Sequence, residues 1–307
     1  MSATRDHESA PVEYRDLRPG LPGTAPFAVI GDPQDTLLLE RALLRRESNP
    51  HERERVLAHL AERRPAFLAI TGDLTSGGWS ARAWRKFDRL VSGLHREGVP
   101  MLPIMGNHDY GMLRGVAARR FAARFPRFAD APWYARTYGR IGMLFLDSNA
   151  AALSREDRRR QREWFAASLD EYDADPAVDG VLVFAHHPPF TNSTVTRDDD
   201  LVQATIVPPF VRSRKGIAML SGHTHAYEHF VEHGKHFIVT GGGGGPRMRL
   251  REGAARRHVD LFAGASPRPF HYLWVTPTSK GLAVDVEGLH KGATTLSTID
   301  RFELAYA

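Results

Sequence analysis

Side chains that can bind metal ions recur in the sequence directly after short apolar runs. Five places have this pattern: "GD" at 31–32, "GD" at 72–73, "GNHD" at 106–109, "HH" at 186–187 and "GHTH" at 222–225. Carboxylate and carbonyl oxygens suit hard divalent ions, and imidazole adds affinity for Mn, Fe or Zn. The sequence therefore contains the donors of a mixed nitrogen and oxygen metal site, and such sites activate water for hydrolysis.

Each of these motifs also has a plain structural interpretation when it is taken alone. A "GD" pair can be a turn whose glycine has a positive φ and whose aspartate caps a helix. The "HHPP" segment at 186–189 can be a strand that proline ends. However, His223 and His225 fall on one side of an extended segment, because side chains alternate along a strand. Two Asp, one Asn and three His together fit two divalent ions, which lie about 3.5–4 Å apart in such sites.

The apolar runs before the motifs predict the strands that position them. These runs cover 26–32, 66–73, 100–109, 181–187 and 217–225, and two more, at 141–148 and 236–245, have the same build without an obvious ligand. Nearly continuous apolar runs indicate strands that are covered on both faces. Helical patterns alternate with them, so we expect a layered α/β domain with ligands at the carboxyl ends of its strands.

The helical patterns have recognisable ends. Residues 36–48 and 52–64 are separated by Asn49-Pro50, which predicts two helices or a kink. Residues 80–98 have Ser80 as the expected N-cap and Gly98 as the stop. Residues 155–172 place Trp164, Phe165 and Leu169 on one stripe, opposite charged residues.

Composition restricts the classes of function. The chain has 307 residues, 42% of them apolar, and a net charge of +5. It contains no cysteine, which excludes disulfides, thiolate metal sites and a cysteine nucleophile. The positive charge can attract anionic substrates, but it is too small and too dispersed to indicate a nucleic-acid partner.

The ends and hydropathy of the chain give three further expectations. We expect a polar N-terminal arm at 1–25, followed by a single domain at 26–307. The N-terminus has no apolar segment typical of a signal peptide, and no stretch approaches the roughly 20 apolar residues that span a bilayer. We therefore expect no membrane span and a cytoplasmic protein.

The order of the motifs from 27 to 245 resembles that of the calcineurin-like metallophosphoesterases. The matching pattern is Asp-x-Gln, Gly-Asp, Gly-Asn-His-Asp, His-x-Pro and Gly-His-x-His. The resemblance implies a four-layer α/β fold, with two mixed sheets packed face to face and helices outside. It also implies a hydrolase of phosphate esters with two divalent metal ions, Mn favoured over Fe or Zn, and a metal-bridging hydroxide as nucleophile.

The resemblance further implies a role for each matching residue. Asp73 bridges both ions, and His108 contacts the phosphoryl group and protonates the leaving group. His186, rather than His187, takes the ligand position because it stands two residues before a proline. The ligand set expected from the resemblance is Asp32, Gln34 and His225 for the first ion and Asn107, His186 and His223 for the second.

Gln34 is the main departure, because the family usually has histidine there. Its amide oxygen can bind a metal ion, although more weakly than imidazole; alternatively, Gln34 hydrogen-bonds a metal-bound water. Ser76 stands where purple acid phosphatases have a tyrosine ligand, so we expect no iron–tyrosinate colour. The GDxxDRG pattern of Ser/Thr protein phosphatases is absent, whereas "GHTHAYEH" is similar to the GHxHxYE segment of the acid phosphatase-like branch, with His229 replacing an arginine.

The substrate is less well indicated than the metal site. The motifs do not separate phosphodiesterase from phosphomonoesterase activity, and a small-molecule or nucleotide-like phosphate ester fits both. His187 and Asn192 are candidate substrate contacts, or alternatively surface residues or supports behind the ligands. The basic segment 247–258 is a candidate lid or anion-attracting rim. The competing hypothesis is a metal-binding module that keeps the fold without turnover.

Overall fold

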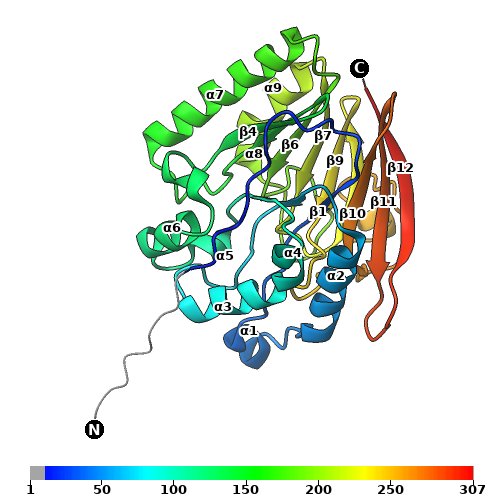
Figure 1. The fold of residues 1–307 in the computed structure, drawn as a ribbon. Coiled ribbons are helices and arrows are strands. Elements are labelled where there is room, and N and C mark those ends of the chain that lie inside the picture. Colours follow the sequence, from blue (N-terminus) through cyan, green and yellow to red (C-terminus); the bar gives the residue numbers. More distant parts are fainter. Residues whose placement is uncertain (1–10, 307) are drawn as a thin grey trace, which may run out of the picture.

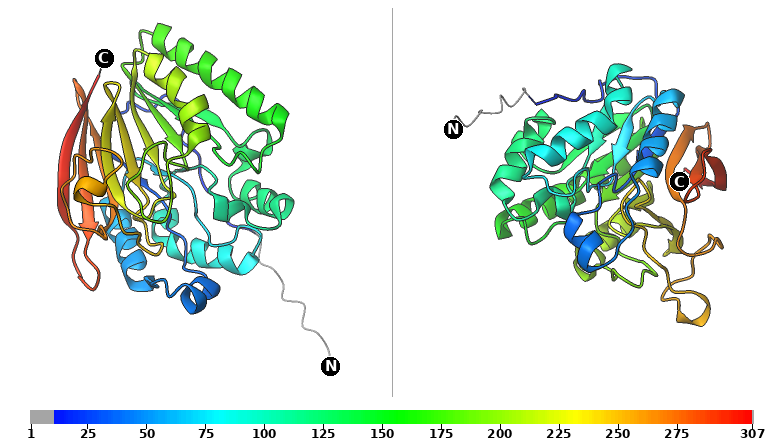
Figure 2. Two further views of the ribbon diagram at one scale, coloured as in Figure 1. Left: turned by 180° about the vertical axis from the view of Figure 1, so that it is seen from behind. Right: turned by 90° about the horizontal axis from the view of Figure 1, so that it is seen from below.

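Two six-stranded mixed sheets pack face to face in the computed structural model, which describes residues 11–306 (Figure 1). The first sheet has the order β12-β11-β10-β1-β2-β3, and the second has the order β4-β5-β6-β7-β9-β8. Helices cover the outer face of each sheet, as the views from behind and below show (Figure 2). The four-layer α/β fold expected from the sequence is therefore confirmed.

The first sheet brings three strand ends to one edge. Its strands are β1 (Phe27–Ile30), β2 (Leu68–Ile70), β3 (Met101–Pro103), β10 (Phe270–Pro277), β11 (Gly281–Leu289) and β12 (Ser297–Ala305). β1, β2 and β3 are parallel, whereas β10, β11 and β12 extend the sheet in antiparallel pairs. Because parallel strands end at the same edge, the segments that contain Asp32, Asp73 and Asn107 leave the sheet side by side.

The second sheet has the same arrangement at its centre. Its strands are β4 (Tyr134–Tyr138), β5 (Ile141–Phe145), β6 (Gly180–Ala185), β7 (Gly216–Ser221), β8 (Tyr227–Glu232) and β9 (Lys235–Thr240). β5, β6, β7 and β9 are parallel, and β4 and β8 are antiparallel strands at the edges. His186 follows β6 directly and His223 lies just after β7.

The helices connect these strands. They are α1 (Leu38–Leu43), α2 (Pro50–Arg63), α3 (Ala81–Leu90), α4 (Ser92–Arg96), α5 (Asn107–Tyr110), α6 (Arg114–Ala122), α7 (Arg155–Ala174), α8 (Asp200–Thr205) and α9 (Val207–Arg212), with 3-10 turns at Pro126–Ala129 and Gly253–Ala255. Asn49 and Pro50 separate α1 from α2, as the sequence predicts. Ser80 caps α3 by accepting a hydrogen bond from the backbone N–H of Ala83 at 3.3 Å.

The segment 80–98 differs from the single helix that its pattern predicts. It forms two helices, α3 and α4, which are divided at Val91. Val91 and Leu94 are both buried in the core between these helices and the first sheet. Packing against the sheet therefore sets the bend, because tertiary contacts readily override helix propensity.

Strand periodicity explains the three layers of core. In β1, Phe27 and Val29 point into the core between the two sheets, whereas Ala28 and Ile30 point toward α2 and α3. In β6, Phe184 joins the central core and Val183 faces α7. Because both faces of the central strands are covered, their sequences are apolar at every position.

Residues 11–25 lie against the domain. Tyr14 is 4% exposed, and its hydroxyl donates to Asp88 at 2.8 Å. The backbone N–H of Met101 donates to the carbonyl of Arg15 at 2.9 Å. The division between an arm at 1–25 and a domain at 26–307 stays a prediction, and residues 1–10 of that arm lie outside the described residues. Across residues 11–306, no helix has the length and apolar character that crossing a membrane requires.

Candidate metal centre

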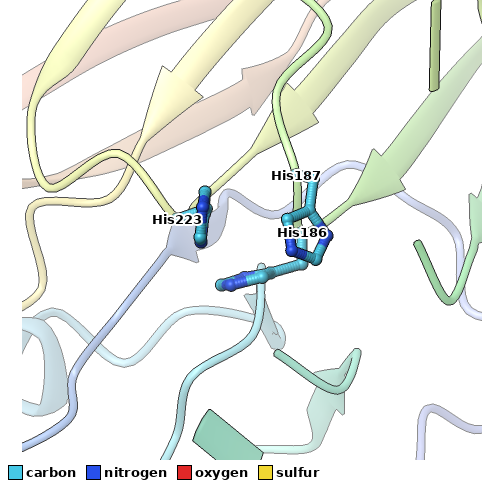
Figure 3. A group of neighbouring side chains, drawn as sticks. All are labelled: His186, His187 and His223. Carbon is cyan, nitrogen blue, oxygen red and sulfur yellow. The ribbon is translucent and has the colours of Figure 1, made fainter. Parts of the chain in front are cut away.

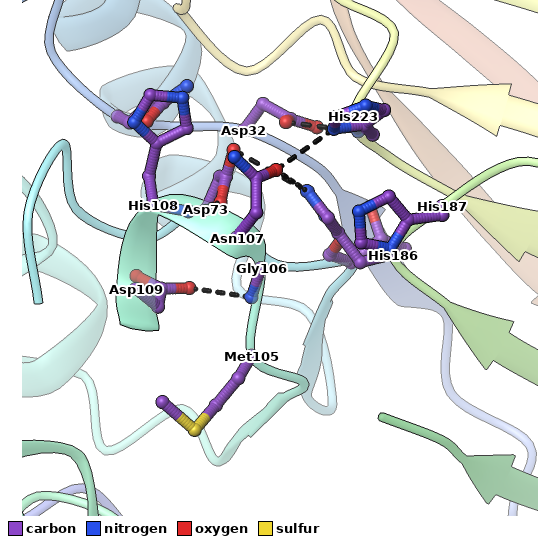
Figure 4. A network of polar contacts seen from close by, with 12 residues as sticks. Asp32, Asp73, Met105, Gly106, Asn107, His108, Asp109, His186, His187 and His223 are labelled. Atoms are coloured by element: carbon purple, nitrogen blue, oxygen red, sulfur yellow. Dashed lines mark hydrogen bonds and ion pairs between the residues drawn. The ribbon is translucent and has the colours of Figure 1, made fainter. Parts of the chain in front are cut away.

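The predicted ligands from both sheets meet at one place. The first sheet provides Asp32, Asp73 and Asn107, and the second provides His186 and His223 (Figure 4). All of them follow strands whose carboxyl ends face the same region, as the α/β architecture predicts. His225 and Gln34 complete the group, since His225 Nε2 lies 3.4 Å from Asp32 Oδ1 and 3.3 Å from Gln34 Nε2. All seven metal ligands expected from the sequence are thus brought together.

Three of these residues have a left-handed backbone conformation. The φ angles are 55° at Asp32, 51° at Asp73 and 64° at His223. Such conformations are uncommon outside glycine, although Asp and His tolerate them better than most residues. They cost on the order of 1–3 kcal/mol each in sparsely populated regions and concentrate at functional sites. All three residues lie in the turns that directly follow a strand, so the strained positions coincide with the candidate ligands.

The glycines of the motifs are required by close approach. A Cβ on Gly106 would lie 2.1 Å from Asp73 Oδ1, and one on Gly222 would lie 2.4 Å from Asp32 Oδ2. Each glycine therefore leaves room for a carboxylate that comes from a different strand. The repeated Gly-Asp, Gly-Asn and Gly-His pairs reflect the packing of one ligand loop on the next.

We call Asn107, His186 and His223 the histidine half of the site. Asn107 Oδ1 lies 3.0 Å from His186 Nε2 and 3.0 Å from His223 Nδ1. His186 Nδ1 lies 2.8 Å from the carbonyl oxygen of Thr71. Because a carbonyl only accepts, Nδ1 donates there, and the lone pair of Nε2 faces the other ligands.

His187 lies beside the histidine half. Its ring centroid is 4.6 Å from that of His223 and 4.9 Å from that of His186 (Figure 3). The three histidines offer ring nitrogens that all lie within 4.8 Å of one another. His187 Nδ1 is 2.8 Å from the hydroxyl oxygen of Ser148, which also accepts the backbone N–H of His187 at 3.0 Å. Burial, with the nearby His186, lowers the pKa of His187 to about 3, so its ring is neutral at pH 7.

We call Asp32, Gln34 and His225 the carboxylate half. The backbone N–H of His223 lies 3.0 Å from both carboxylate oxygens of Asp32. His225 Nδ1 is 2.9 Å from the carbonyl oxygen of Pro246, so Nδ1 donates and Nε2 faces Asp32. All three side chains are buried, with exposed fractions of 0% for Asp32, 2% for Gln34 and 4% for His225.

The surroundings of Gln34 indicate whether the carboxylate half can hold a metal ion. Its Oε1 atom is buried and has no hydrogen-bond partner. Leaving a buried acceptor unpaired costs about 1–3 kcal/mol, and a cation in contact with the oxygen removes that cost. The half thus combines an anionic oxygen, a neutral amide oxygen and an imidazole nitrogen, a donor set that divalent ions such as Mn²⁺ accept. The residues present fit a metal ion.

Asp73 lies between the two halves. Its Oδ2 is 3.5 Å from His186 Nε2, and its Oδ1 accepts the backbone N–H of His108 at 2.8 Å. Asp73, Asp32 and His225 also form a group whose ligand atoms lie within 4.8 Å of one another. Burial opposes the ionisation of Asp73, but His186 and His108 outweigh it and hold the pKa well below its usual range. The half-buried ring of His108 stands on the same side of its helical turn as the Asn107 carboxamide (Figure 4).

Asp109 is a support that the sequence analysis did not assign. It is fully buried, and it accepts the backbone N–H groups of Leu74, Thr75 and Gly106 at 3.0–3.1 Å. Burial raises its pKa to about 7. Asp109 ties the loop after β2 to the loop after β3, and its place in the "GNHD" motif is the signal that could have identified it.

Ser148 is a second residue that the sequence analysis missed. It follows Asp147 at the end of the 141–148 run, for which no ligand was expected. The structure places its hydroxyl on His187. Its position at the end of a strand was the only signal in the sequence. This signal is weak, because serine is common at strand ends for other reasons.

Asn192 does not join the site. Its Oδ1 accepts the backbone N–H groups of Arg257 and His258, and its Nδ2 donates to the carbonyl of His258 at 3.0 Å. With these bonds made and the residue 1% exposed, the structure favours a bracing role for Asn192 over the substrate contact expected from the sequence. The guanidinium of Arg257 also donates to the carbonyl of Thr191 at 2.7 Å, so this part of the basic segment is fixed to a neighbouring loop.

Comparison with protein families agrees with this geometry. Residues 25–227 match the model of the calcineurin-like phosphoesterases. The chain belongs to this family. The family assignment agrees with the metal-binding chemistry of the side chains that the structure brings together.

Individual relatives are more distant. A cAMP/cGMP dual specificity phosphodiesterase of Mycobacterium tuberculosis is 29% identical over 169 residues, which are 53% of this chain and 49% of the relative. The metallophosphoesterase thus spans about half the length of the curated relative that it matches. Purple acid phosphatase from yellow lupin seeds (Lupinus luteus) has a TM-score of 0.69 at 15% identity, over 94% of this chain and 55% of that one. A dimetal phosphatase from Danio rerio has a TM-score of 0.62 at 14% identity, over 93% and 100%. These two likenesses show the fold.

Proposed function

We propose that this metallophosphoesterase hydrolyses a small phosphate ester with two divalent metal ions, one in each half of the site. The observation that carries the proposal is the position of Asp73, which joins both groups of ligands. Its carboxylate approaches His186 of the histidine half and is grouped with Asp32 and His225 of the carboxylate half. A carboxylate shared in this way is the usual bridge of two-metal hydrolases.

Divalent ions bound here would polarise the phosphoryl oxygens and make a water molecule nucleophilic near neutral pH. The protein's own groups hold the geometry. The carbonyls of Thr71 and Pro246 fix the rings of His186 and His225 with a nitrogen lone pair directed inward. The backbone N–H of His108 fixes the Asp73 carboxylate. Mn²⁺ is the favoured ion, because oxygen ligands outnumber nitrogens in the carboxylate half.

His108 is the proposed proton donor to the leaving group. It adjoins Asn107, and its half-buried ring lies on the same side of its helical turn as the Asn107 carboxamide. A general acid must reach the leaving oxygen, directly or through one water.

A phosphodiester is the favoured substrate class. The relative from M. tuberculosis is described as a phosphodiesterase, and this likeness is what supports the preference. Phosphomonoesters remain the second candidate, because the same metal core serves both reactions. The competing hypothesis of a metal-binding module without turnover loses support because His108 and six of the seven usual ligand types are present, and Gln34 at the seventh position can still offer an oxygen.

Hydrolysis of matched aryl esters tests the proposal. The Mn²⁺-loaded protein would be assayed with 4-nitrophenyl phosphate and bis(4-nitrophenyl) phosphate, with Asp73→Asn as the control. We expect turnover of the diester to exceed that of the monoester and to fall by about 10³-fold in the variant, since a main electrostatic contributor is lost. A preference for the monoester would move the assignment to phosphomonoesterase. Bound metal without turnover of either ester would establish the binding module instead.

A further inference from the structure

An apolar cavity lies next to the histidine half of the site. It has a volume of about 260 Å³ and is enclosed by the loop after β5, by α7 and by α8. Its walls include Leu146, Phe165, Val202 and Ile206, whose exposed fractions are 6% or less. The cavity is therefore a recess that reaches into the core beneath α7 and α8, unlike a shallow surface depression.

The cavity adjoins the metal centre. A second pocket of about 310 Å³ is lined by Asn107 and His187, and it shares Ser148, Ala150 and Leu201 with the apolar cavity. The space beside Asn107 and the apolar cavity therefore lie next to each other, on either side of these three residues.

The uncharged polar side chains around the cavity are already hydrogen-bonded within the protein. Gln161 accepts the backbone N–H of Asp147 at 2.8 Å and donates to the carbonyl of the same residue at 2.9 Å. Thr205 donates to the carbonyl of Leu201 at 2.7 Å, and Ser148 bonds His187. These groups offer little to the hydrogen-bonding edge of a nucleobase or sugar, so the recess suits a group without polar atoms.

The volume limits the size of that group. An apolar cavity of about 150 Å³ is enough to hold a benzene molecule, so the observed space accepts one ring with a short linker or a branched alkyl chain. Leaving such a volume empty in a core costs stability. Arg158 and Arg162 also line the cavity, and a guanidinium can stack on an aromatic ring.

We propose that the recess binds an apolar ester group of the substrate, aromatic or branched alkyl, while the phosphoryl group lies at the metal centre. This inference rests on the proposed function and narrows it to phosphate esters with an apolar alcohol. Burial of such a group contributes about 25 cal/mol per Å² of apolar surface, which is sufficient to decide between a small and a large ester.

The test compares methyl and benzyl esters, because the two alcohols have similar acidity and differ mainly in size. The pair would be methyl and benzyl 4-nitrophenyl phosphate, followed by release of 4-nitrophenol, or methyl and benzyl phosphate if the protein proves to be a monoesterase. We expect kcat/KM for the benzyl ester to exceed that for the methyl ester at least tenfold. A ratio near one would overturn the inference while leaving the proposed function intact.

A variant that fills the recess locates the preference. Leu153→Trp adds volume at the cavity wall, and we expect it to lower the benzyl-to-methyl ratio at least fivefold. Leu44→Trp is the matched control, because Leu44 is 63% exposed and is not among the cavity residues; it should keep the wild-type ratio. If Leu153→Trp does not fold, Ala150→Leu adds volume where the two pockets adjoin and should shift the ratio in the same direction. An unchanged ratio in a folded filling variant would place the preference elsewhere, whereas no turnover of any ester would reject the proposed function itself.

Discussion

The two halves of the candidate metal centre differ in exposure and in ligand chemistry. In the carboxylate half, Asp32, Gln34 and His225 are almost completely buried. In the histidine half, Asn107 is exposed and His223 is partly exposed, and the pocket beside them opens to solvent. Substrate therefore has access from the histidine half, while the carboxylate half forms the closed floor of the site.

The ligand chemistry differs in the same direction. The histidine half has two imidazoles and an amide, and each ring is held by a second contact. The carboxylate half has a neutral glutamine where the family usually has histidine, and its oxygen is unpaired. Because imidazole binds transition metals more strongly than an amide oxygen does, the carboxylate half should bind its metal ion with the lower affinity.

Among changes confined to one half of the site, the largest effect is expected from Asn107→Ala. The Asn107 oxygen contacts both rings of the histidine half. Its loss therefore removes one candidate ligand and a contact that orients each of the two rings. We expect kcat to fall by about 10²–10³-fold and one metal ion per chain to be lost on dialysis. Ester hydrolysis and metal analysis by mass spectrometry would measure both effects.

Asn192→Ala is the matched control for this variant. It removes an asparagine that makes three hydrogen bonds, but to the 257–258 segment rather than to metal ligands. We expect a lower melting temperature with the metal content unchanged. If both variants kept their metal, Asn107 would not be a ligand, and the division into halves would need revision.

A smaller effect is expected at Gln34. If its oxygen binds the metal ion, Gln34→Leu removes a ligand while keeping a similar side-chain volume. The metal affinity of the carboxylate half should then fall about tenfold, the lower end of the loss that follows when a contact of a metal site is removed. Gln34→His should raise that affinity above the wild-type value. A calorimetric titration with Mn²⁺ distinguishes binding in the carboxylate half from binding in the histidine half.

The opposite result would also be informative. Wild-type affinity in Gln34→Leu would mean that Gln34 only hydrogen-bonds water near the metal ion. In that case Gln34→His would still create a ligand, so only the leucine variant decides the present role.

The grouping of the candidate ligands could be predicted from the sequence because each one belongs to a local motif. Asp73 and Asn107 each follow an apolar run and a glycine. The glycine is required there because a Cβ at its position would clash with atoms of a neighbouring loop. Strand order then brings these ends together without further information, since parallel strands end at one edge. The layered α/β class followed from the same periodicity, whereas the four-layer arrangement followed from the family resemblance.

The supports of the site could not be predicted in this way. Ser148 and His187 are 39 residues apart, and their hydrogen bond depends on the pairing of β5 with β6. The use of Asn192 by the 257–258 segment depends on two loops that have no regular pattern. The bend at Val91 came from packing against the sheet. Contacts of this kind require the three-dimensional arrangement, because each partner alone is an ordinary polar or apolar residue.

Ser148→Ala should have a moderate effect that belongs to the histidine half alone. Without the hydroxyl, the His187 ring loses the contact that orients it. We expect kcat/KM to fall by about tenfold or less, in the range of lost supporting contacts, with the metal content unchanged. Ser213→Ala is the control, because Ser213 is also buried but bonds Asp173, near the C-terminal end of α7, rather than a residue of the site. Equal losses of activity in both variants would indicate a general structural effect.

The smallest effect concerns Glu228, which braces the loop behind the carboxylate half. Its carboxylate accepts the Thr191 hydroxyl at 2.6 Å and the Asn192 backbone N–H at 2.7 Å, and burial raises its pKa to about 7. A folded-state pKa above the unfolded value contributes stability that is fully present below about pH 4.5 and is lost as the pH rises through about 7.

This contribution should lower the melting temperature by a few degrees as the pH rises from about 4.5 to 7, since a shift of this size amounts to about 3 kcal/mol at most. Glu228→Gln removes the titration and retains an accepting oxygen, so the variant should lack this decrease. The buried His229 and His271, whose pKa burial lowers to about 4, act in the opposite direction over this interval. They act equally in both proteins, so the difference between the two melting curves isolates Glu228. An equal pH dependence in the variant and the wild type would show that the closed side of the site owes its pH response to groups other than Glu228.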